Sequence, residues 1–568
     1  MSNVYNGPNA GHYVNELHAT PNHGPSQISV TSEDFEVSRI HGKAISPIGV
    51  STEKTLRREL NANQITMITL GGTLGTGLLV GSGSALNEGG PLGIVIAYII
   101  VCAYFMMTSL AEMSTYLPDK KGFVGLVTRY VHPSIGFALG WTYMCRFLVV
   151  PASHINTAAV VVFYGGGGNQ VPIHGWRLIF IVGVNFLGIR AFGHFEFWLS
   201  TLKVTVLVAL ILFGLVIDLG GAPLKEPDSR SLAGLAGLFW RPPYGPFGNP
   251  AWAGENIYAV GDTLRFVGFW STLVKSLFSL MGMELLGVTV GEAENPYRLV
   301  LSLYLLAVIT MGFICSSDDP TFWNDTAPLG DKSPFIIAAR RLVANGIVPV
   351  ISAAIAVFAL SGATSNIYTG SRILYGLSLD GQGPAWLRKK VTSRGQPLVS
   401  LGLVTVFCLL SFVGEAEQAK AFDYFVDVTT TAGAISWICI FWAHIRFRKA
   451  LKAQHYPLDT LRYVSSLHPI GTYFALVATV IITMFKGVGS YADRGFRGCI
   501  AAYILIVFYL LLLGGWCYWR TGLPKPIPLN EIDLDAGRRE IDEEEVEWNN
   551  EQSMRKLRPW WRRISDYT

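Results

Sequence analysis

Two apolar stretches of the chain combine glycine with polar groups where a membrane helix needs an unbroken backbone. The first, TLGGTLGTGLLVGSG at 69–83, is crowded with glycine, and the second, FSLMGMELLGVTVGEAENP at 278–296, places Glu284 between Gly282 and Gly287. In hydrocarbon, a helix is broken only where protein or a water-filled cavity surrounds the freed backbone groups. Freed N–H groups at the start of a half-helix bind a carboxylate, and freed carbonyls accept from an ammonium. Paired breaks would therefore suit a zwitterion.

A single glycine-rich membrane segment is explained more simply by close helix packing through small residues. The second break changes that balance, because transporters built from inverted repeats carry interrupted helices at corresponding positions of their two halves. With five spans per repeat, the first span corresponds to the sixth, and glycine interrupts both of them in this chain. The pattern predicts a substrate site between the two breaks, near the bilayer midplane.

The rest of the chain is expected to supply the helices that such a site needs. Of 568 residues, 50% are hydrophobic and only 15% are charged, and the mean hydropathy is +0.37. Soluble domains are about 25% charged. Apolar runs of roughly spanning length number about twelve: 64–86, 91–114, 134–163, 176–192, 197–219, 266–290, 298–316, 346–376, 397–414, 422–444, 469–488 and 497–519. We therefore predict an all-α, polytopic membrane protein.

The placement of charge predicts the orientation in the membrane. Lysine and arginine in short loops mark the cytosolic side, and an N-terminus in the cytosol brings most of them to that side: Lys54, Arg57, Arg58, Lys120, Lys121, Arg129, Arg388, Lys389, Lys390, Arg394, Arg446, Arg448, Lys449 and Lys452. Residues 1–55 are polar, lack the apolar core of a signal peptide and are predicted to be a disordered cytosolic tail. A transmembrane domain at 56–520 and a cytosolic tail at 521–568 follow.

Four motifs resemble those of the fungal amino acid permeases of the amino acid–polyamine–organocation superfamily: LRRELNANQITMITLGGTLGTGLLVGSGSALNEGGPLG at 56–93, GEAENP at 291–296, SGATSNIYTGSRILYGLSLDGQGP at 361–384 and TTTAGAISWICIFWAHIRFRKA at 429–450. The resemblance implies a fold of five plus five inverted helices, with helices one and six broken, and two added helices. It also implies import of amino acids with protons across the plasma membrane. The implied partners are an amino acid, protons and the lipid bilayer, without cofactor, metal or nucleic acid. The oligomeric state is left open.

By the same resemblance, the substrate is bound by groups of the two breaks, its carboxylate by Thr73, Gly75, Thr76 and Gly77 and its ammonium by carbonyls around Leu70, Phe278, Ser279 and Met281. The residue types agree with this assignment, because glycine lets a ligand approach the backbone and threonine adds an uncharged hydroxyl. Phe278 and Trp270 are candidates to close the pocket. Plain core packing is the alternative for both rings.

Three ionisable residues are candidates for proton coupling: Glu284, Lys203 and Glu292. Glu284 is the most central acid, and an unpaired carboxyl among apolar neighbours would favour its protonated form and so carry a proton. Alternatively, it accepts hydrogen bonds from freed N–H groups and stays ionised. Glu292 follows about two helical turns later, where it is either a relay or gate partner or merely an acid at a helix end.

Lys203 lies in STLKVTVLVAL of the fifth span and is an intramembrane cation. Such residues are functional candidates by default. In relatives, a lysine at this place resembles a substitute for a bound sodium ion, and the lysine touches the first and eighth helices. Burial would let this lysine release a proton. The alternative is that Lys203 extends its ammonium to the cytosolic surface.

The third span, GWTYMCRFLVVPASHINTA, carries two departures from the family pattern. Many relatives have a glutamate where Ser153 stands, and those that import basic amino acids resemble each other in using it. Its absence removes an attraction for cationic side chains, so we expect neutral L-amino acids, with Ser153 lining the site. Arg146 stands where relatives tend to carry an aromatic residue. A charge at that depth costs several kcal/mol unless it is paired or wetted, so Arg146 should face an acid or a cavity.

Other functions compete with transport. A non-transporting amino acid sensor of the same fold would keep the ligand site, and Ser153 and the segment after GEAENPYR, shorter than in relatives, leave room for it. A membrane-embedded enzyme is disfavoured because the spans contain no HExxH motif, nucleophile elbow or cluster of metal ligands. A channel would need a continuous pore with rings of charge or carbonyls, whereas paired breaks favour an enclosed central site.

Overall fold

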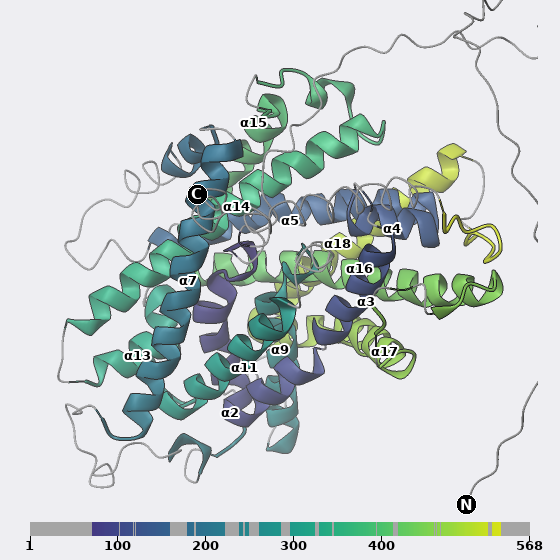
Figure 1. The fold of residues 1–568 in the computed structure, drawn as a ribbon. Helices are drawn as coiled ribbons and strands as arrows, with labels where there is room; N and C mark the ends of the chain where they lie inside the picture. Colours follow the sequence, from purple (N-terminus) through teal and green to yellow (C-terminus); the bar gives the residue numbers. More distant parts are fainter. Residues whose placement is uncertain are drawn as a thin grey trace, which may run out of the picture. The chain divides into compact units, whose positions relative to one another are not determined.

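The computed structural model describes residues 67, 71–101, 103–117, 119, 121–159, 179–186, 189–221, 238–241, 245–248, 261–285, 296–323, 329–342, 346–392, 395–412, 418–458, 461, 463–465, 467–520 and 525–535. All of them belong to one unit of the chain, Lys54–Thr568. Within these ranges the regular structure is helical, with no β-strand (Figure 1).

The helical elements range from single turns to the 36 residues of the longest helix. In chain order they are the π-helix η1 (Gly77–Gly81), α2 (Ser82–Ile100), α3 (Ala103–Tyr116), α4 (Phe123–Tyr130), α5 (Pro133–Ala159), α7 (Ile189–Asp218), η3 (Leu238–Trp240), α9 (Asp262–Leu280), α11 (Pro296–Ile314), α12 (Pro320–Trp323), η5 (Leu329–Lys332), α13 (Pro334–Arg340), α14 (Ile347–Leu379), η6 (Ala385–Arg388), α15 (Leu398–Phe407), η7 (Cys408–Phe412), α16 (Gln418–Ala453), α17 (Ile470–Phe485) and α18 (Gly487–Arg520).

Seven helical segments of the described chain are long and apolar enough to cross a membrane: Gly71–Tyr116, Pro133–Ala158, Ala191–Asp218, Ile347–Leu379, Ala421–Ala453, Ile470–Ala492 and Arg494–Trp519. Shorter apolar helices occupy Val300–Ile314 and Leu398–Phe412. The segment Gly71–Tyr116 covers two predicted spans, and it turns between them at Gly90, whose φ is +72°. The all-α, polytopic fold predicted from hydropathy is confirmed.

The outer surface of several helices is apolar, as lipid-facing helices require. Large hydrophobic side chains are exposed along α7, α17 and α18, among them Leu212, Val477 and Leu511. Inside the protein, by contrast, many polar and charged side chains are buried. Because lipid offers no hydrogen bonds, polar groups of a membrane protein gather in its interior, where they mark candidate functional regions.

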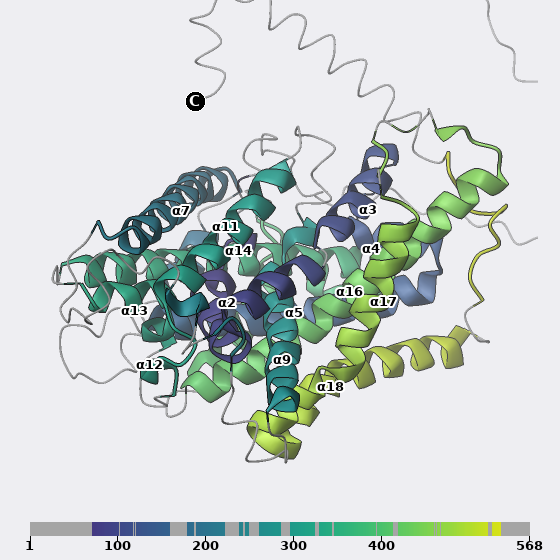
Figure 2. The ribbon, with the colours of Figure 1, turned by 90° about the horizontal axis from the view of Figure 1, so that it is seen from below.

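Four elements contact η1 of the first break: α2, α9, α13 and η5. Helix α2 runs along α9, so the two glycine-interrupted segments are neighbours (Figures 1 and 2). Helix α5 packs along α14 and α16, and α7 packs against α11 and α14. Helices α17 and α18 lie against α16. This arrangement brings charged side chains from distant parts of the sequence to the two breaks.

Candidate functional site

The first predicted break is confirmed. Residues 71–73 are helical, the backbone bends at Leu74 and Gly75, and helix resumes at Thr76 and continues as the π-helix η1. The Gly75 N–H donates to the Thr73 carbonyl over 2.8 Å, so the chain folds back where the regular helical bonds are lost. Backbone groups freed in this way need partners from elsewhere.

Side chains of three other helices supply partners at the first break. The hydroxyl of Tyr304 on α11 donates to the Thr73 carbonyl over 2.8 Å, and that of Ser279 on α9 donates to the Gly77 carbonyl over 2.8 Å. On α5, Nδ1 of His154 lies 3.1 Å from the hydroxyl of Thr76. The break is therefore held by the helices around it.

The second predicted break is also confirmed. Helix α9 ends at Leu280, Met281 has an extended backbone with φ −65° and ψ 139°, and helix resumes at Met283. Between them, Gly282 has φ +103°, a conformation that side-chain-bearing residues rarely adopt. Glycine is required at this position by the backbone itself.

The two breaks touch each other through glycine. A methyl group on Gly77 would lie 2.9 Å from Cα of Ser279, and one on Gly282 would lie 3.4 Å from Cα of Thr73. At Gly77 a side chain would require the opposite backbone to move, whereas at Gly282 a methyl group would only make ordinary contact and the positive φ is what requires glycine. Close helix packing is the simpler explanation of the glycines. The structure shows both close packing and helix breaks at these positions.

Most of the residues expected to bind substrate gather at these breaks, with differences. The Phe278 ring covers Gly77 and packs edge-on against Phe422 of α16 at 5.9 Å between centroids, so it borders the first break as expected. The Met281 sulfur packs against Gly433 of α16. Two expected residues, Leu70 and Glu292, lie outside the described residues.

Trp270 follows the alternative of plain packing and does not close the pocket. Its indole N–H donates over 2.9 Å to the carbonyl of Phe485 at the end of α17. Trp270 lies ten residues before the end of α9, which at 1.5 Å per residue is about 15 Å from the break. It packs helices α9 and α17 together instead.

Ser153 is buried on α5, and its hydroxyl has no hydrogen-bond partner within the described part of the chain. The adjacent His154 makes the contact with the first break, and its ring also lies 3.2 Å from where a methyl group on Gly362 of α14 would be. Sequence reasoning missed His154. A histidine in an apolar span, next to a residue already selected, is the signal that could have found it.

Glu284 is surrounded by hydrogen-bond donors, so the premise that this carboxyl is unpaired is wrong. Its Oε1 accepts from Nη1 of Arg146 and from the hydroxyl of Tyr143, each over 2.7 Å. Its Oε2 accepts from the Gly282 N–H over 2.9 Å and from the indole of Trp437 over 3.3 Å. One freed backbone N–H, that of Gly282, is among these donors, as the alternative interpretation expects, and the other three donors are side chains. The expectation that Arg146 faces an acid is confirmed.

Lys203 does not extend to the membrane surface. It is fully buried, its ammonium donates to the Gly71 carbonyl over 2.6 Å, and it lies 3.7 Å from Oε1 of Glu196. The same oxygen accepts from Ser361 of α14 over 2.5 Å. The expected contact with the first helix is confirmed, and the link to the helix of Ser361 runs through Glu196.

Glu196 is the main residue that sequence reasoning missed. It lies seven residues before Lys203, close to two turns of helix, so both side chains project from one face of α7. The spacing was readable in FEFWLSTLK. An intramembrane acid two turns from an intramembrane lysine is a pair that the sequence alone could have proposed.

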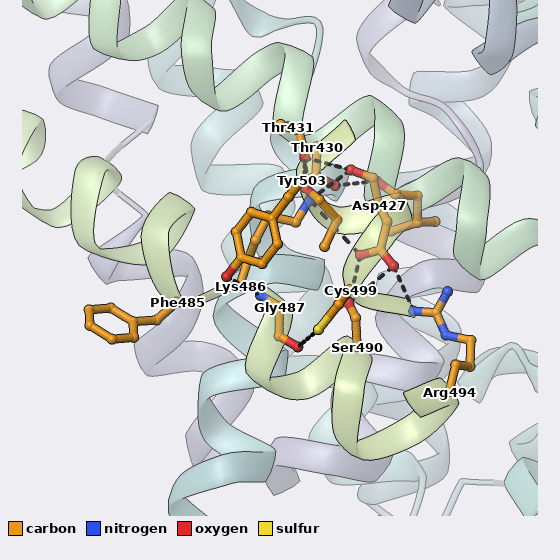
Figure 3. Close-up of polar contacts among 12 residues, drawn as sticks. Asp427, Thr430, Thr431, Phe485, Lys486, Gly487, Ser490, Arg494, Cys499 and Tyr503 are labelled. Atoms are coloured by element: carbon orange, nitrogen blue, oxygen red, sulfur yellow. Dashed lines mark hydrogen bonds and ion pairs between the residues drawn. The ribbon is translucent and has the colours of Figure 1, made fainter. Parts of the chain in front are cut away.

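A third buried charged cluster joins α16 to the junction of α17 and α18, as Figure 3 shows. The Asp427 carboxylate accepts from Ser490 over 2.9 Å and from Arg494 over 2.7 Å. The ammonium of Lys486 donates to the Asp427 carbonyl over 2.7 Å and to the hydroxyl of Thr431 over 2.6 Å.

The same cluster borders a small cavity that α9 and α2 complete. Its lining includes Glu88 and Lys275, which form an ion pair of 2.5 Å, together with Asp427, Lys486 and Arg494. The cavity is distinct from the contact between the two breaks. Sequence reasoning did not single out these residues.

Comparison with known proteins identifies the family. The profile of the amino acid permease family matches residues 64–527. The dicarboxylic amino acid permease of Saccharomyces cerevisiae is 35% identical over 525 residues, which cover 88% of this chain and 83% of that protein.

Two further relatives differ in the substrates that their names state. The proline-specific permease of Emericella nidulans is 32% identical, over 89% of this chain and 93% of its own. The lysine-specific permease of Saccharomyces cerevisiae is 30% identical, over 90% of this chain and 83% of its own. With its buried helix breaks and apolar spans, the chain belongs to the amino acid permease family, multi-pass membrane proteins that transport amino acids.

Proposed function

We propose that this chain imports neutral L-amino acids together with protons across the plasma membrane, with both termini in the cytosol. The observation that carries the proposal is the direct contact between two interrupted helices at Gly77 and Gly282. Backbone groups that no longer bond within a helix are oriented there and can recognise both ends of a zwitterion.

The substrate carboxylate is proposed to bind at Thr73, Gly75, Thr76 and Gly77, with the ammonium at carbonyls of Leu70, Phe278, Ser279 and Met281. The Phe278 carbonyl already accepts from the Met281 N–H over 3.2 Å. A carbonyl oxygen has two lone pairs, so it can accept from an ammonium as well. Binding in this way needs the two breaks to separate slightly, since Gly77 now packs on Ser279 and Gly282 lies next to Thr73.

The expected substrate class follows from charge. The buried pairs Arg146–Glu284 and Lys203–Glu196 each combine one cation with one anion, and Ser153 adds no charge. A site with balanced charges offers no net attraction to a cationic or anionic side chain. The names of the relatives cover dicarboxylic, neutral and basic amino acids and so do not choose among these classes.

For proton coupling, we propose a role for Lys203, because its ammonium contacts the first break directly through the Gly71 carbonyl. A change of charge beside this ammonium alters how strongly Lys203 holds the backbone that binds substrate. The role of Glu284 as proton carrier stays a prediction, and its carboxyl meets four hydrogen-bond donors. Glu292 remains a candidate relay.

The experiment is uptake of a panel of labelled amino acids by cells that lack their own permeases, at several external pH values. We expect saturable uptake of a neutral amino acid that increases as the external pH falls. Surface expression with ligand binding but no uptake of any amino acid would contradict transport and support the sensor. Uptake that is indifferent to pH would contradict proton coupling alone.

A further inference from the structure

We propose that Glu196 is the group that binds the transported proton, while Lys203 keeps its charge throughout the cycle. This inference rests on the proposed function, because it assigns the proton of a proton-coupled permease to an atom. The contacts of the carboxyl, the charge of the pair and the packing of both residues on the first break carry it.

The Glu196 carboxyl is incompletely partnered for a buried anion. Its Oε1 accepts from Ser361 over 2.5 Å and from Ser200 over 3.5 Å. The Ser365 hydroxyl also lies near the carboxyl, but Oε2 makes no hydrogen bond of normal geometry within the described ranges. A buried ionised group with an unsatisfied oxygen carries a desolvation cost. A proton on Oε2 removes that cost and leaves the contacts of Oε1 in place.

Charge balance shows where an incoming proton goes. With Lys203 an ammonium and Glu196 a carboxylate, the pair is neutral, and one proton from the external side adds to a carboxylate oxygen. The product is a carboxylic acid beside an ammonium, and release of the same proton to the cytosol restores the starting state. Deprotonating Lys203 instead would leave a buried carboxylate without its counter-ion, which is strongly unfavourable. The ammonium left beside a protonated Glu196, or beside the amide of Glu196→Gln, keeps the Gly71 carbonyl as a partner.

The pair is packed directly on the first break. A methyl group on Gly71 would overlap the hydroxyl of Ser200 and the carboxyl of Glu196. The Lys203 ammonium is shared between Glu196 and the Gly71 carbonyl, two residues before Thr73. When Glu196 is protonated, its attraction for the ammonium falls, and the ammonium binds the Gly71 carbonyl more strongly.

This sharing couples the proton to the substrate. Protonation of Glu196 strengthens the hydrogen bond from Lys203 to the Gly71 carbonyl and so stabilises the conformation of the first break. Because coupling free energies are reciprocal, a substrate that binds this conformation must in turn strengthen proton binding. Without the proton, the carboxylate competes with the break for the ammonium. Substrate and proton are then bound and released together.

Helices packed around α7 bring few other ionisable groups to the pair. Those that face this region are already engaged with other partners: His154 on α5 with Thr76, Tyr304 on α11 with Thr73, Tyr368 and Arg372 on α14 with each other, and Arg340 on α13 with Asp331. Arg146 on α5 is paired with Glu284. Within the described residues, Lys203 is the only cation in an ion pair with Glu196.

The test uses the full-length permease in lipid vesicles, with the neutral amino acid that the uptake panel selects. Glu196→Gln keeps the shape and mimics the protonated acid. We expect substrate exchange to fall less than about tenfold, whereas substrate-induced proton entry is lost and the pH dependence of uptake flattens. Proton entry that persists in Glu196→Gln overturns the proposal. Loss of exchange together with proton entry also overturns it, because Glu196 is then a structural counter-charge.

A second pair of variants tests the carboxyl without removing it. Ser361→Ala deletes a hydrogen bond that favours the ionised carboxylate, so the midpoint of the pH dependence should move to higher pH by about one unit. Thr364→Ala is the matched control, because its hydroxyl bonds only within α14, to the Leu360 carbonyl over 2.8 Å. An unmoved midpoint in Ser361→Ala, or an equal shift in both variants, overturns the proposal.

The outcome for the unmodified protein separates this proposal from the proposed function. If the unmodified permease brings in no protons with substrate, proton coupling itself fails. If it does so and Glu196→Gln does so as well, coupling stands and only the assignment to Glu196 fails.

Discussion

The two helix breaks each carry a buried ion pair, and the two pairs are built differently. At the second break, the Glu284 carboxylate accepts from four donors, and its cation is the guanidinium of Arg146. At the first, Glu196 retains an unpartnered oxygen within the described residues, and its cation is the ammonium of Lys203. Both oxygens of Glu284 are therefore partnered, whereas in the described part of the chain only one oxygen of Glu196 is.

We call Arg146–Glu284 the fixed pair, because we propose that it keeps its charges, and Lys203–Glu196 the responsive pair, because we propose that its carboxyl gains and loses a proton. The pair at Glu284 satisfies the backbone of the second break and joins it to α5 and α16, so its charge state is part of the folded structure. The pair at Glu196 lies 3.7 Å apart and shares its ammonium with a backbone carbonyl. We propose that these two equally buried acids differ in function because they meet different numbers of donors.

The largest effect is expected at the fixed pair. Glu284→Gln leaves the buried Arg146 without its counter-ion, and removing one partner of a buried pair typically costs about 3–5 kcal/mol. We expect loss of most folded protein, measured by the thermal stability of the detergent-solubilised permease. The double variant Arg146→Gln with Glu284→Gln should recover part of that loss. A stable Glu284→Gln permease that exchanges substrate but no longer moves protons would instead restore Glu284 as the carrier.

A methyl group at the first break should disturb the responsive pair. In Gly71→Ala, the new methyl overlaps Ser200 and Glu196, so we expect uptake to fall by about tenfold or more, a cost above about 1.4 kcal/mol. Gly72→Ala is the matched control, since the nearest atom to its methyl is Cβ of Ser365 at 3.9 Å. Initial rates of uptake at equal surface expression measure both, and equal rates would contradict the packing of Glu196 on the break.

Sequence reasoning predicted the parts of this comparison that are local. Glycine in an apolar stretch marks both breaks, and hydropathy marks the spans around them. The pairing of Arg146 with Glu284 was not predicted, because the two residues lie on different spans and nothing local relates them. The depth of Lys203 was also ambiguous, since an ammonium two turns into a helix can reach the surface or turn inward. Only packing decides between these directions.

The smallest effect concerns substrate choice. With balanced pairs and an uncharged Ser153, lysine and arginine should compete poorly with neutral amino acids for uptake. Ser153→Glu introduces a buried acid near His154 and should increase competition by lysine, by about tenfold or less. Competition assays against one labelled neutral substrate measure this. If lysine competes best in the unmodified protein, the inference from the third span is wrong.

The most direct test of the account is infrared difference spectroscopy of the carboxyl groups, in the substrate-bound permease, between neutral and acidic pH. We predict that acidification produces a carbonyl band of a buried carboxylic acid in the unmodified protein, and that Glu196→Gln abolishes this band. A band of undiminished intensity in Glu196→Gln would show that another acid takes the proton and would contradict the account.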